Sequence, residues 1–370
     1  MSRANILLLT TRTGGGHLNL AQALTEQLSS KYDVTITDPY PTIIHHYYST
    51  LSRHFLSLWQ LQYVWTDNRV GSRLLHSSLT LLNKHRIRDV IEHVQPQLII
   101  STHSLLSYEL ARANDFHARG GKKQKIPLVF QLTDLEEVHT TWFTEKHADA
   151  YLAPSREIYA QALQHGITPG RLHTTGRPVR KQFLDVSLST RAETLTGLGL
   201  DPTIFTIFLQ GGAKGSAGID QTVRCILGGT VPIQIILAVG NNRTLAAHFS
   251  GIERLAVLPF TEKIAPYMAA ADIIAGKAGA SFLTEAFILE KPFVVTTFIP
   301  GQEEPSLRFL QRYNLGWVCL DAAEQQDLVT ALACNPALIA EKVSSIRAYK
   351  EWNLQANRTV PAIIDSLIAP

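Results

Sequence analysis

The sequence predicts an α/β protein with two domains, each built on a parallel β-sheet. In both halves of the chain, short apolar runs rich in β-branched residues alternate with segments of helical spacing, as βαβ units require. A chain of 370 residues is also too long for one ordinary α/β domain and is sufficient for two. A glycine-rich turn follows the first apolar run of each half.

Ten apolar runs are expected to form the strands of the two sheets. The segments between them carry helical spacing, such as Leu20, Leu24 and Leu28. We expect a first domain over 1–184 and a second over 185–344, with a connection at 185–203 and a C-terminal helix at about 345–370 that packs back on the first domain. The expected strands are 4–10, 33–37, 96–102, 126–134 and 148–154 in the first half, and 203–212, 232–240, 255–260, 271–279 and 292–298 in the second.

Composition excludes several classes of protein. No run approaches the roughly 20 apolar residues that span a bilayer, and no targeting segment is visible at the start, so a cytoplasmic location is expected. Three cysteines without paired spacing argue against disulfides and structural zinc. Residues 1–180 carry 19 Lys+Arg and 14 Asp+Glu, a charge of +5, whereas residues 181–370 carry 15 and 17, a charge of −2. The positive half suits an anionic surface such as a phospholipid leaflet, and would equally suit nucleic acid.

Residues 43–93 interrupt the regular alternation of strands and helices. Their mixture of aromatic and basic side chains favours contact with a membrane interface. A pair of helices whose aromatic residues pack on the first sheet would explain the same pattern, so both interpretations stay open. The aromatic residues are Tyr47, Tyr48, Phe55, Trp59, Tyr63 and Trp65, and the basic ones are Arg53, Arg69, Arg73, Lys84, Arg86 and Arg88.

The first glycine turn, 13–17, ends in a histidine. Glycines at a strand-to-helix turn let a ligand approach the backbone and the N-terminus of the helix. The spacing does not match the dinucleotide fingerprint or the P-loop, so dehydrogenase and kinase functions lose support. His17 is the side chain of this turn best suited to accept a hydroxyl proton near neutral pH.

The second half contains two further features that suit a ligand. A glycine turn at 209–218 follows its first strand and could hold a diphosphate. A later segment, 271–310, places Glu285 on a helix, and Gln302 and Glu303 after a strand. Carboxylates and amides in such positions can bind sugar hydroxyls.

Several ordered motifs together resemble the monogalactosyldiacylglycerol synthase and processive diacylglycerol glucosyltransferase family, and more distantly the peptidoglycan N-acetylglucosaminyltransferase. The resemblance implies the GT-B architecture, with two facing Rossmann-like domains and a cleft between them. It also implies an inverting transfer of a hexose from a UDP-sugar, with no metal in the chemical step and no other cofactor. The motifs are TGGGH at 13–17, ISTH at 100–103, LTDLEEVHTTWF at 132–143, TTGRPVRKQF at 174–183, LQGGAKGSAG at 209–218 and the segment KAGASFLTEAF to GQEEPS at 277–306.

The resemblance also assigns roles to individual residues. It makes His17 the general base that takes the acceptor's proton and His139 its rival, while Gly15, His103 and Trp142 line the acceptor site. Trp142 packs against lipid or against its own domain. On the donor side, Glu285 holds the ribose, Gln302 and Glu303 meet the hexose hydroxyls, and Arg180 faces the diphosphate. The remaining donor-binding positions are Gly16, Gly211, Gly212, Gly215, Ser216, Phe260, Thr261, Lys277, Ala278 and Gly279.

The chain departs from the family pattern where specificity is determined. Arg12 and Leu18 replace an aspartate and an arginine that flank the histidine in plant-type members, and Glu304, Pro305 and Ser306 replace Ala-Gly-Asn. An acidic partner of the histidine is therefore not expected at position 12. These differences leave open galactose, glucose or another hexose as the transferred sugar, and an acceptor other than diacylglycerol.

The expected reaction is transfer of that hexose to a diacylglycerol-type lipid by a peripheral protein on the inner face of the cell membrane. The expected partners are a UDP-hexose, the lipid acceptor and an anionic membrane surface, with no nucleic acid. Two alternatives remain. One is an isomerase like the UDP-sugar 2-epimerases, which would act without lipid, and the other is an inactive relative that binds a nucleotide sugar without turnover.

Overall fold

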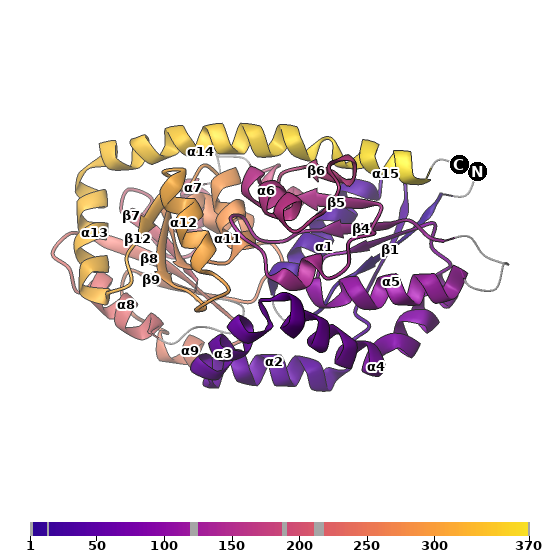
Figure 1. The fold of residues 1–370 in the computed structure, drawn as a ribbon. Coiled ribbons are helices and arrows are strands. Elements are labelled where there is room, and N and C mark those ends of the chain that lie inside the picture. Colours follow the sequence, from indigo (N-terminus) through magenta and orange to yellow (C-terminus); the bar gives the residue numbers. More distant parts are fainter. Residues whose placement is uncertain (1–2, 13–14, 119–124, 187–190, 211–217, 369–370) are drawn as a thin grey trace. The chain divides into compact units, whose positions relative to one another are not determined.

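Two parallel six-stranded β-sheets, each with helices on its faces, form the fold (Figure 1). The computed structural model describes residues 3–12, 15–118, 125–186, 191–210 and 218–368. The described chain forms two compact units. The first comprises 1–180, 300–305 and 352–370, and the second comprises 181–299 and 306–351.

The first unit contains a sheet with the strand order β2-β1-β3-β4-β5-β6. All five neighbouring pairs are parallel. The strands are β1 (Asn5–Leu9), β2 (Asp33–Thr37), β3 (Leu98–Ser101), β4 (Leu128–Gln131), β5 (Ala150–Ala153) and β6 (Leu172–Thr174). The helices are α1 (Gly15–Leu28), α2 (Thr42–His54), α3 (Leu56–Thr66), α4 (Arg69–Val94), α5 (Ser104–Ala118), α6 (Arg156–Gln164) and α15 (Val360–Ile368), with 3-10 turns η1 (Thr140–Phe143) and η2 (Pro169–Arg171).

The second unit has the strand order β12-β11-β10-β7-β8-β9, again with parallel pairs throughout. Its strands are β7 (Phe205–Gln210), β8 (Ile233–Gly240), β9 (Leu255–Pro259), β10 (Ile273–Lys277), β11 (Phe293–Thr297) and β12 (Gly316–Val318). Its helices are η3 (Lys181–Phe183), α7 (Arg191–Gly197), α8 (Ile219–Leu227), α9 (Arg243–His248), α10 (Ala265–Ala270), α11 (Ala280–Ile288), α12 (Glu304–Arg312) and α13 (Ala322–Cys334). Helix α14 (Pro336–Asn357) contains the boundary between the two units.

The side chains of β1 alternate between two apolar clusters, one on each face of the first sheet. Ile6 and Leu8 belong to an apolar cluster that includes residues of α1 and α15. Leu7 and Leu9 belong to a second cluster, with residues of α4 and α5. Successive side chains of a strand point to opposite faces, so a continuous apolar run is what a strand covered by helices on both sides requires.

The C-terminal residues pack on the first unit. Val360 and Ile364 of α15 are fully buried in the cluster behind β1. Upstream, the Asn353 side chain accepts a hydrogen bond from the Arg177 main-chain N at 2.7 Å and donates to the Arg177 oxygen at 3.0 Å. Gly176 has a positive φ of 65°, and a Cβ there would lie 2.8 Å from Asn353. The turn before Arg177 therefore needs glycine.

The α/β fold class with two parallel sheets is confirmed, and all ten expected strands are present. The sequence did not predict β6 and β12, which are three-residue strands at sheet edges. Residues 43–93 form three helices, α2, α3 and α4, instead of the pair expected (Figure 1). Among the described residues, none of the helices combines the length and the apolar character that crossing a membrane would need.

Candidate functional site

The first group of candidate residues lies at the carboxyl edge of the first sheet. β1 and β3 are neighbours although β2 lies between them in the sequence, so the strand order reverses direction at this pair. Open α/β sheets bind ligands at such a reversal, beside the carboxyl ends of the strands. His17, on α1 after β1, and His103, after β3, flank this point.

His17 has a defined tautomer. Its Nδ1 lies 2.8 Å from the main-chain oxygen of Thr102. A carbonyl can only accept, so Nδ1 carries the proton and Nε2 carries the free lone pair. Burial, opposed by the hydrogen bond to Thr102 and reinforced by the charge of Arg177, lowers the pKa of His17 from 6.5 to about 4. The imidazole is therefore neutral at physiological pH and able to accept a proton through Nε2.

His103 is a close neighbour of His17, with ring centroids 4.4 Å apart and planes tilted by 53°. Its Nδ1 accepts a hydrogen bond from the Leu105 main-chain N at 3.2 Å. Burial is the main cause that lowers the pKa of His103, and the charge of His17 lowers it further. His17 thus adds to the effect of burial on His103, and both imidazoles are neutral near pH 7.

His139 is held on both sides of its ring. Nδ1 accepts a hydrogen bond from the Thr141 main-chain N at 3.2 Å, so the proton is on Nε2, which donates to the Tyr63 main-chain oxygen at 3.1 Å. Burial lowers the pKa of His139, although the charge of Asp67 opposes this shift. With both nitrogens engaged, the geometry fits a structural role better than that of a base. Trp142 is 2% exposed in the apolar core, so of its two expected roles the structure shows packing within its own unit.

At position 12, where no acidic partner of His17 was expected, the structure shows a main-chain hydrogen bond. The Arg12 main-chain N donates to a carboxylate oxygen of Asp38 at 2.8 Å, and His45 Nε2 lies 3.0 Å from the same oxygen. The carboxylate that contacts this segment is therefore that of Asp38, which follows β2. The carbonyl of Thr102 takes the place of a carboxylate in orienting His17.

Sequence reasoning missed two contributors to the environment of His17. Thr102 acts through its backbone, for which side-chain patterns give no signal. Arg177 is almost fully buried, donates a hydrogen bond to the Thr133 oxygen and lowers the pKa of His17 by its charge. The signal for Arg177 was available, because it lies inside the GRPVR motif from which only Arg180 was selected.

The second group lies at the carboxyl edge of the second sheet. β7 and β10 are neighbours, and the strand order reverses at this pair as it does between β1 and β3. Gly276, in β10, has φ 149°, and a Cβ there would lie 1.9 Å from the Gln210 oxygen at the end of β7. Only glycine permits this close approach of the two strand ends.

The turn after β10 places three expected donor-binding residues at the start of α11. Lys277 ends β10, Ala278 is buried, and Gly279 is the N-cap residue of α11. The nine residues of α11 aim its N-terminal N–H groups at this edge, which favours bound negative charge. Glu285 lies one and a half turns further along and is 6% exposed.

The other expected donor-binding residues that the structure describes fall into two groups. Some follow strand β9 of the second sheet, and the rest belong to the first unit. Phe260 follows β9 and is 61% exposed, while the Thr261 hydroxyl accepts a hydrogen bond from the Lys263 N at 3.1 Å. Arg180 and Glu303 are buried and group with the first unit, as does Gln302. The four expected residues of the turn after β7, Gly211, Gly212, Gly215 and Ser216, lie outside the described residues.

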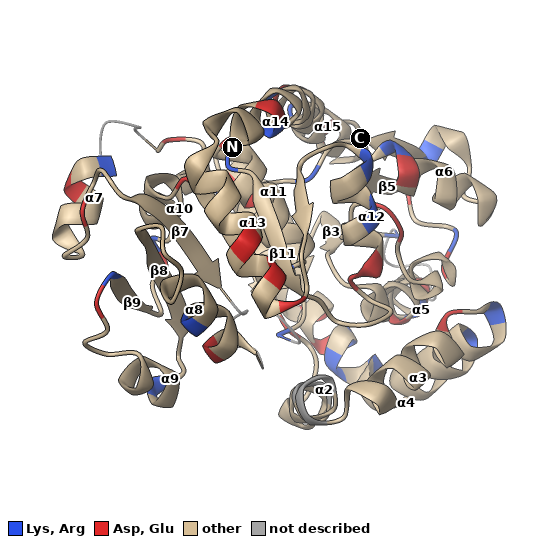
Figure 2. Ribbon diagram, turned by 90° about the vertical axis from the view of Figure 1, so that its left-hand side faces the viewer, with Lys and Arg blue, Asp and Glu red and all other residues tan. Residues whose placement is uncertain are grey.

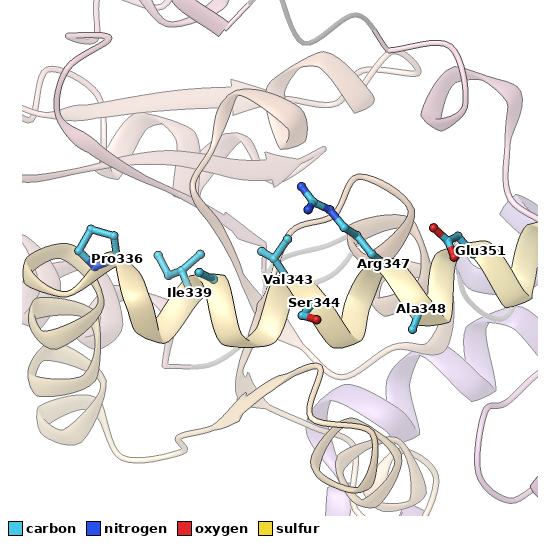
Figure 3. Close-up of a pocket in the computed structure, with 8 residues that line it drawn as sticks. Pro336, Ile339, Val343, Ser344, Arg347, Ala348 and Glu351 are labelled. Carbon is cyan, nitrogen blue, oxygen red and sulfur yellow. The ribbon is translucent and has the colours of Figure 1, made fainter.

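Neither a hollow on α14 nor a cluster of metal ligands offers an alternative site. The hollow is lined by eight residues from Pro336 to Glu351, all on α14 (Figure 3), so no second element contributes to it. Over the described ranges, no three His, Cys, Asp or Glu side chains gather as a metal would require.

Each unit matches the sequence profile of a known family. Residues 17–179 match the family described as monogalactosyldiacylglycerol (MGDG) synthase. Residues 206–314 match the glycosyltransferase family 28 C-terminal domain. These matches confirm the resemblance inferred from the motifs. One of the two matched families covers residues of the first unit, and the other covers residues of the second.

Curated relatives include plant enzymes. The chain is 29% identical over 337 residues to the monogalactosyldiacylglycerol synthase of Spinacia oleracea, which is 85% of this chain and 63% of that protein. It is 28% identical over 333 residues to monogalactosyldiacylglycerol synthase 1 of Arabidopsis thaliana, covering 84% of this chain and 61% of the relative. The chain thus spans somewhat under two thirds of the length of these relatives.

Solved structures show the same fold at low identity. HepE of Anabaena, in complex with UDP and glucose, has a TM-score of 0.60 and 14% identity, covering 98% of this chain and all of that one. S. aureus MnaA with UDP has a TM-score of 0.67 and 11% identity, covering 98% of this chain and 97% of that chain. MurG of Acinetobacter baumannii has a TM-score of 0.56 and 14% identity, covering 94% and 95%. These similarities confirm the GT-B fold.

Proposed function

We propose, on the premise that this chain is a relative of the monogalactosyldiacylglycerol synthases, that it transfers a hexose from a UDP-sugar to the hydroxyl of a diacylglycerol-type lipid. The observation that carries the proposal is the geometry of His17, whose neutral ring carries its lone pair on Nε2 at the carboxyl edge of the first sheet. The match of the two units to an MGDG synthase profile and to a glycosyltransferase C-terminal profile supports it.

In the proposed reaction His17 acts as general base in a single displacement. The lipid hydroxyl gives its proton to Nε2 while its oxygen attacks the anomeric carbon of the hexose. A new glycosidic C–O bond forms, the bond from that carbon to the diphosphate oxygen breaks, and UDP leaves with the electron pair. Attack from the face opposite the leaving group inverts the anomeric configuration. A positioned base of this kind contributes about 100-fold to 10,000-fold in rate.

The second unit supplies the proposed donor site. We assign the ribose to Glu285, whose burial on α11 suits a carboxylate that binds hydroxyl groups. The N-terminus of α11 at Gly279 would stabilise the charge that builds on the leaving diphosphate, together with Lys277. Arg180, which groups with the first unit, keeps the role toward the diphosphate that the resemblance implies. We assign uracil to Phe260 and Thr261. The proposal needs no metal, because these groups supply the positive potential.

Gln302 and Glu303 are the proposed readers of the hexose. The Gln302 Oε1 atom is buried and accepts no hydrogen bond from any residue that the structure describes. A buried acceptor without a partner is costly unless a ligand supplies a donor. A hexose hydroxyl would supply one. This assignment leaves the identity of the sugar to experiment.

The proposed lipid partner fits the surface of α2, α3 and α4. Large apolar side chains cover these helices at exposed positions, and Figure 2 shows both charged and uncharged segments along α3 and α4. We propose that an anionic phospholipid bilayer covers this surface. Helix α4 carries basic residues in addition to its exposed apolar ones, and residues 1–180 carry a net charge of +5. The exposed apolar residues are Ile43, Tyr47, Phe55, Leu56, Leu58, Leu61, Val64, Trp65, Val70, Leu74, Leu81 and Leu82, and the basic residues of α4 are Arg69, Arg73, Lys84, Arg86 and Arg88.

An isomerase is the second candidate, since a protein of Listeria monocytogenes described as a putative UDP-N-acetylglucosamine 2-epimerase shares the fold. Its identity of 13% supports the fold alone. An epimerase would have no use for the apolar face on α2 to α4. An inactive relative that binds nucleotide sugars would keep the donor site and lose turnover.

The test incubates the purified protein with liposomes that contain diacylglycerol and, separately, UDP-galactose and UDP-glucose. UDP release and lipid products are followed by mass spectrometry. A hexosyl lipid from one donor supports the proposal and identifies the sugar. Conversion of a UDP-sugar without lipid supports an isomerase. UDP binding without any turnover would contradict the transferase and favour the inactive relative.

A further inference from the structure

Tyr63 lies on the less exposed side of α3. On this helix, Leu61, Val64 and Trp65 are exposed to 66%, 62% and 59%. Tyr63 and Trp59 are only partly exposed, and their ring centroids are 6.4 Å apart. The helix thus presents one face to the proposed bilayer and turns these two aromatic side chains away from it.

The inward side of α3 is fastened to the turn at η1. The ring of Tyr63 meets the ring of His139 edge to face, with centroids 4.5 Å apart, and its main-chain oxygen accepts the hydrogen bond from His139 Nε2. One turn later, an Asp67 carboxylate oxygen accepts a hydrogen bond from the Thr140 main-chain N at 2.7 Å. These contacts fix the direction of the Tyr63 side chain.

The same ring reaches the segment that carries the proposed hexose readers. Residues 300–305 group with the first unit by their contacts. A Cβ built on Gly301 would lie 3.1 Å from Cδ1 of Tyr63, so the ring packs directly against the Gly301 backbone. Gly301 has a positive φ of 79°, which favours glycine for a second reason. Gln302, whose buried Oε1 accepts no hydrogen bond from the described residues, and the buried Glu303 follow immediately.

We propose that Tyr63 is a positioning residue that couples docking of α3 on an anionic bilayer to the conformation of residues 300–305, and so to recognition of the donor hexose. The inference deepens the proposed function and rests on it. A bilayer that immobilises α3 through its outer face also immobilises Tyr63, and the ring then restricts the Gly301 backbone. Ordering the segment before the sugar arrives removes part of the entropy cost of binding it.

Hydrogen exchange of the full-length protein tests the coupling without any transfer reaction. The amides of Gly301, Gln302, Glu303 and Glu304 are followed with and without vesicles of phosphatidylglycerol and phosphatidylcholine that lack diacylglycerol. In the wild type, vesicles should slow exchange of this segment. In Tyr63→Ala, exchange should be faster by about tenfold, the size of one lost aromatic contact, and no longer respond to vesicles.

Three further variants control for folding and for general effects on docking. Tyr63→Phe keeps the ring and should behave as the wild type, while Tyr63→Leu keeps apolar bulk for the helix but should resemble Tyr63→Ala. Leu163→Ala removes an exposed apolar side chain of α6, outside the proposed lipid face, and should leave exchange of residues 300–305 unchanged with and without vesicles. In the transfer assay, KM for the UDP-sugar should rise about tenfold in Tyr63→Leu, whereas affinity for UDP alone should not change.

The outcomes separate this inference from the proposed function. Vesicle-dependent protection that requires the Tyr63 ring, without a glycolipid product from any donor, would support the coupling and contradict the proposed transfer. Equal exchange of residues 300–305 in the wild type, Tyr63→Leu and Tyr63→Ala would overturn the coupling even if transfer is observed. A wild-type segment whose exchange does not respond to bound vesicles would overturn it as well.

Discussion

The Nδ1 atom of His17 lies 2.8 Å from the main-chain oxygen of Thr102, and this contact determines which ring nitrogen can act on a substrate. In many histidine bases a carboxylate performs this orienting role. Here a carbonyl at the end of β3 performs it. Burial is the largest cause of the low pKa of His17, and the hydrogen bond to this carbonyl opposes it only in part.

Removal of the proposed base should abolish transfer and spare donor binding. His17→Ala should lower kcat by about 100-fold to 10,000-fold, because the acceptor hydroxyl then loses its proton acceptor, and calorimetric affinity for UDP should be unchanged. His93→Ala, which removes an exposed histidine at the end of α4, serves as the matched control. Near-normal turnover of His17→Ala would remove the assignment.

The pH dependence should reflect the low pKa of His17. The imidazole accepts a proton only when neutral, and it is neutral above its pKa, so kcat/KM should be flat through neutral pH and fall on acidification with a midpoint near 4. The profile should be measured under conditions where the fold is shown to survive, for example by near-UV circular dichroism. An acid limb of kcat/KM near the ordinary value of 6.5 would place the base elsewhere, because this profile reports the free enzyme.

Replacement of His139 should affect stability more than chemistry. His139→Ala removes the hydrogen bonds to the Tyr63 oxygen and the Thr141 N, and we expect it to destabilise the protein by about 1–3 kcal/mol in urea unfolding. The pH profile of the remaining activity should keep the midpoint of the wild type. A shifted midpoint with unchanged stability would instead identify His139 as the titrating base.

Glu285 provides a test of the donor site that does not depend on turnover. Glu285→Ala should weaken UDP binding about tenfold to 100-fold, as loss of a hydrogen bond to a charged group would. Glu193→Ala, an exposed carboxylate of α7 in the same unit, should bind UDP normally. Because Glu285 is buried, thermal unfolding of both variants should be compared, and unchanged UDP affinity in a folded Glu285→Ala would contradict the ribose assignment.

Gly276 should tolerate no side chain. A Cβ there would overlap the Gln210 oxygen in a backbone conformation that L-residues avoid, so Gly276→Ala should cost about 3 kcal/mol or more in free energy of unfolding. Gly197→Ala adds a methyl group where no atom lies within 4 Å and should change stability by about 0.5 kcal/mol at most. Equal stability of the two variants would refute the close approach of β7 and β10.

Local sequence patterns were sufficient to predict ten of the strands and the glycine turn that ends in His17. Apolar runs such as 4–10 are visible because strands covered on both faces need continuous burial, and the glycine turn with His17 is visible because its residue types are rare in that order. The three-residue strands β6 and β12 escaped notice, since their residues become strands only by pairing with β5 and β11.

Only the tertiary structure decided how the candidate side chains are engaged. It brought Thr102, 85 residues away, to His17 and so fixed the tautomer of the proposed base. It placed Trp142 in the core, engaged both nitrogens of His139, and set Tyr63 against Gly301. These relations depend on backbone atoms and on packing between distant segments. Residue types and their spacing predict neither the contacts of backbone atoms nor the packing between distant segments. Hydrophobic periodicity, in contrast, predicts directly which side chains are buried.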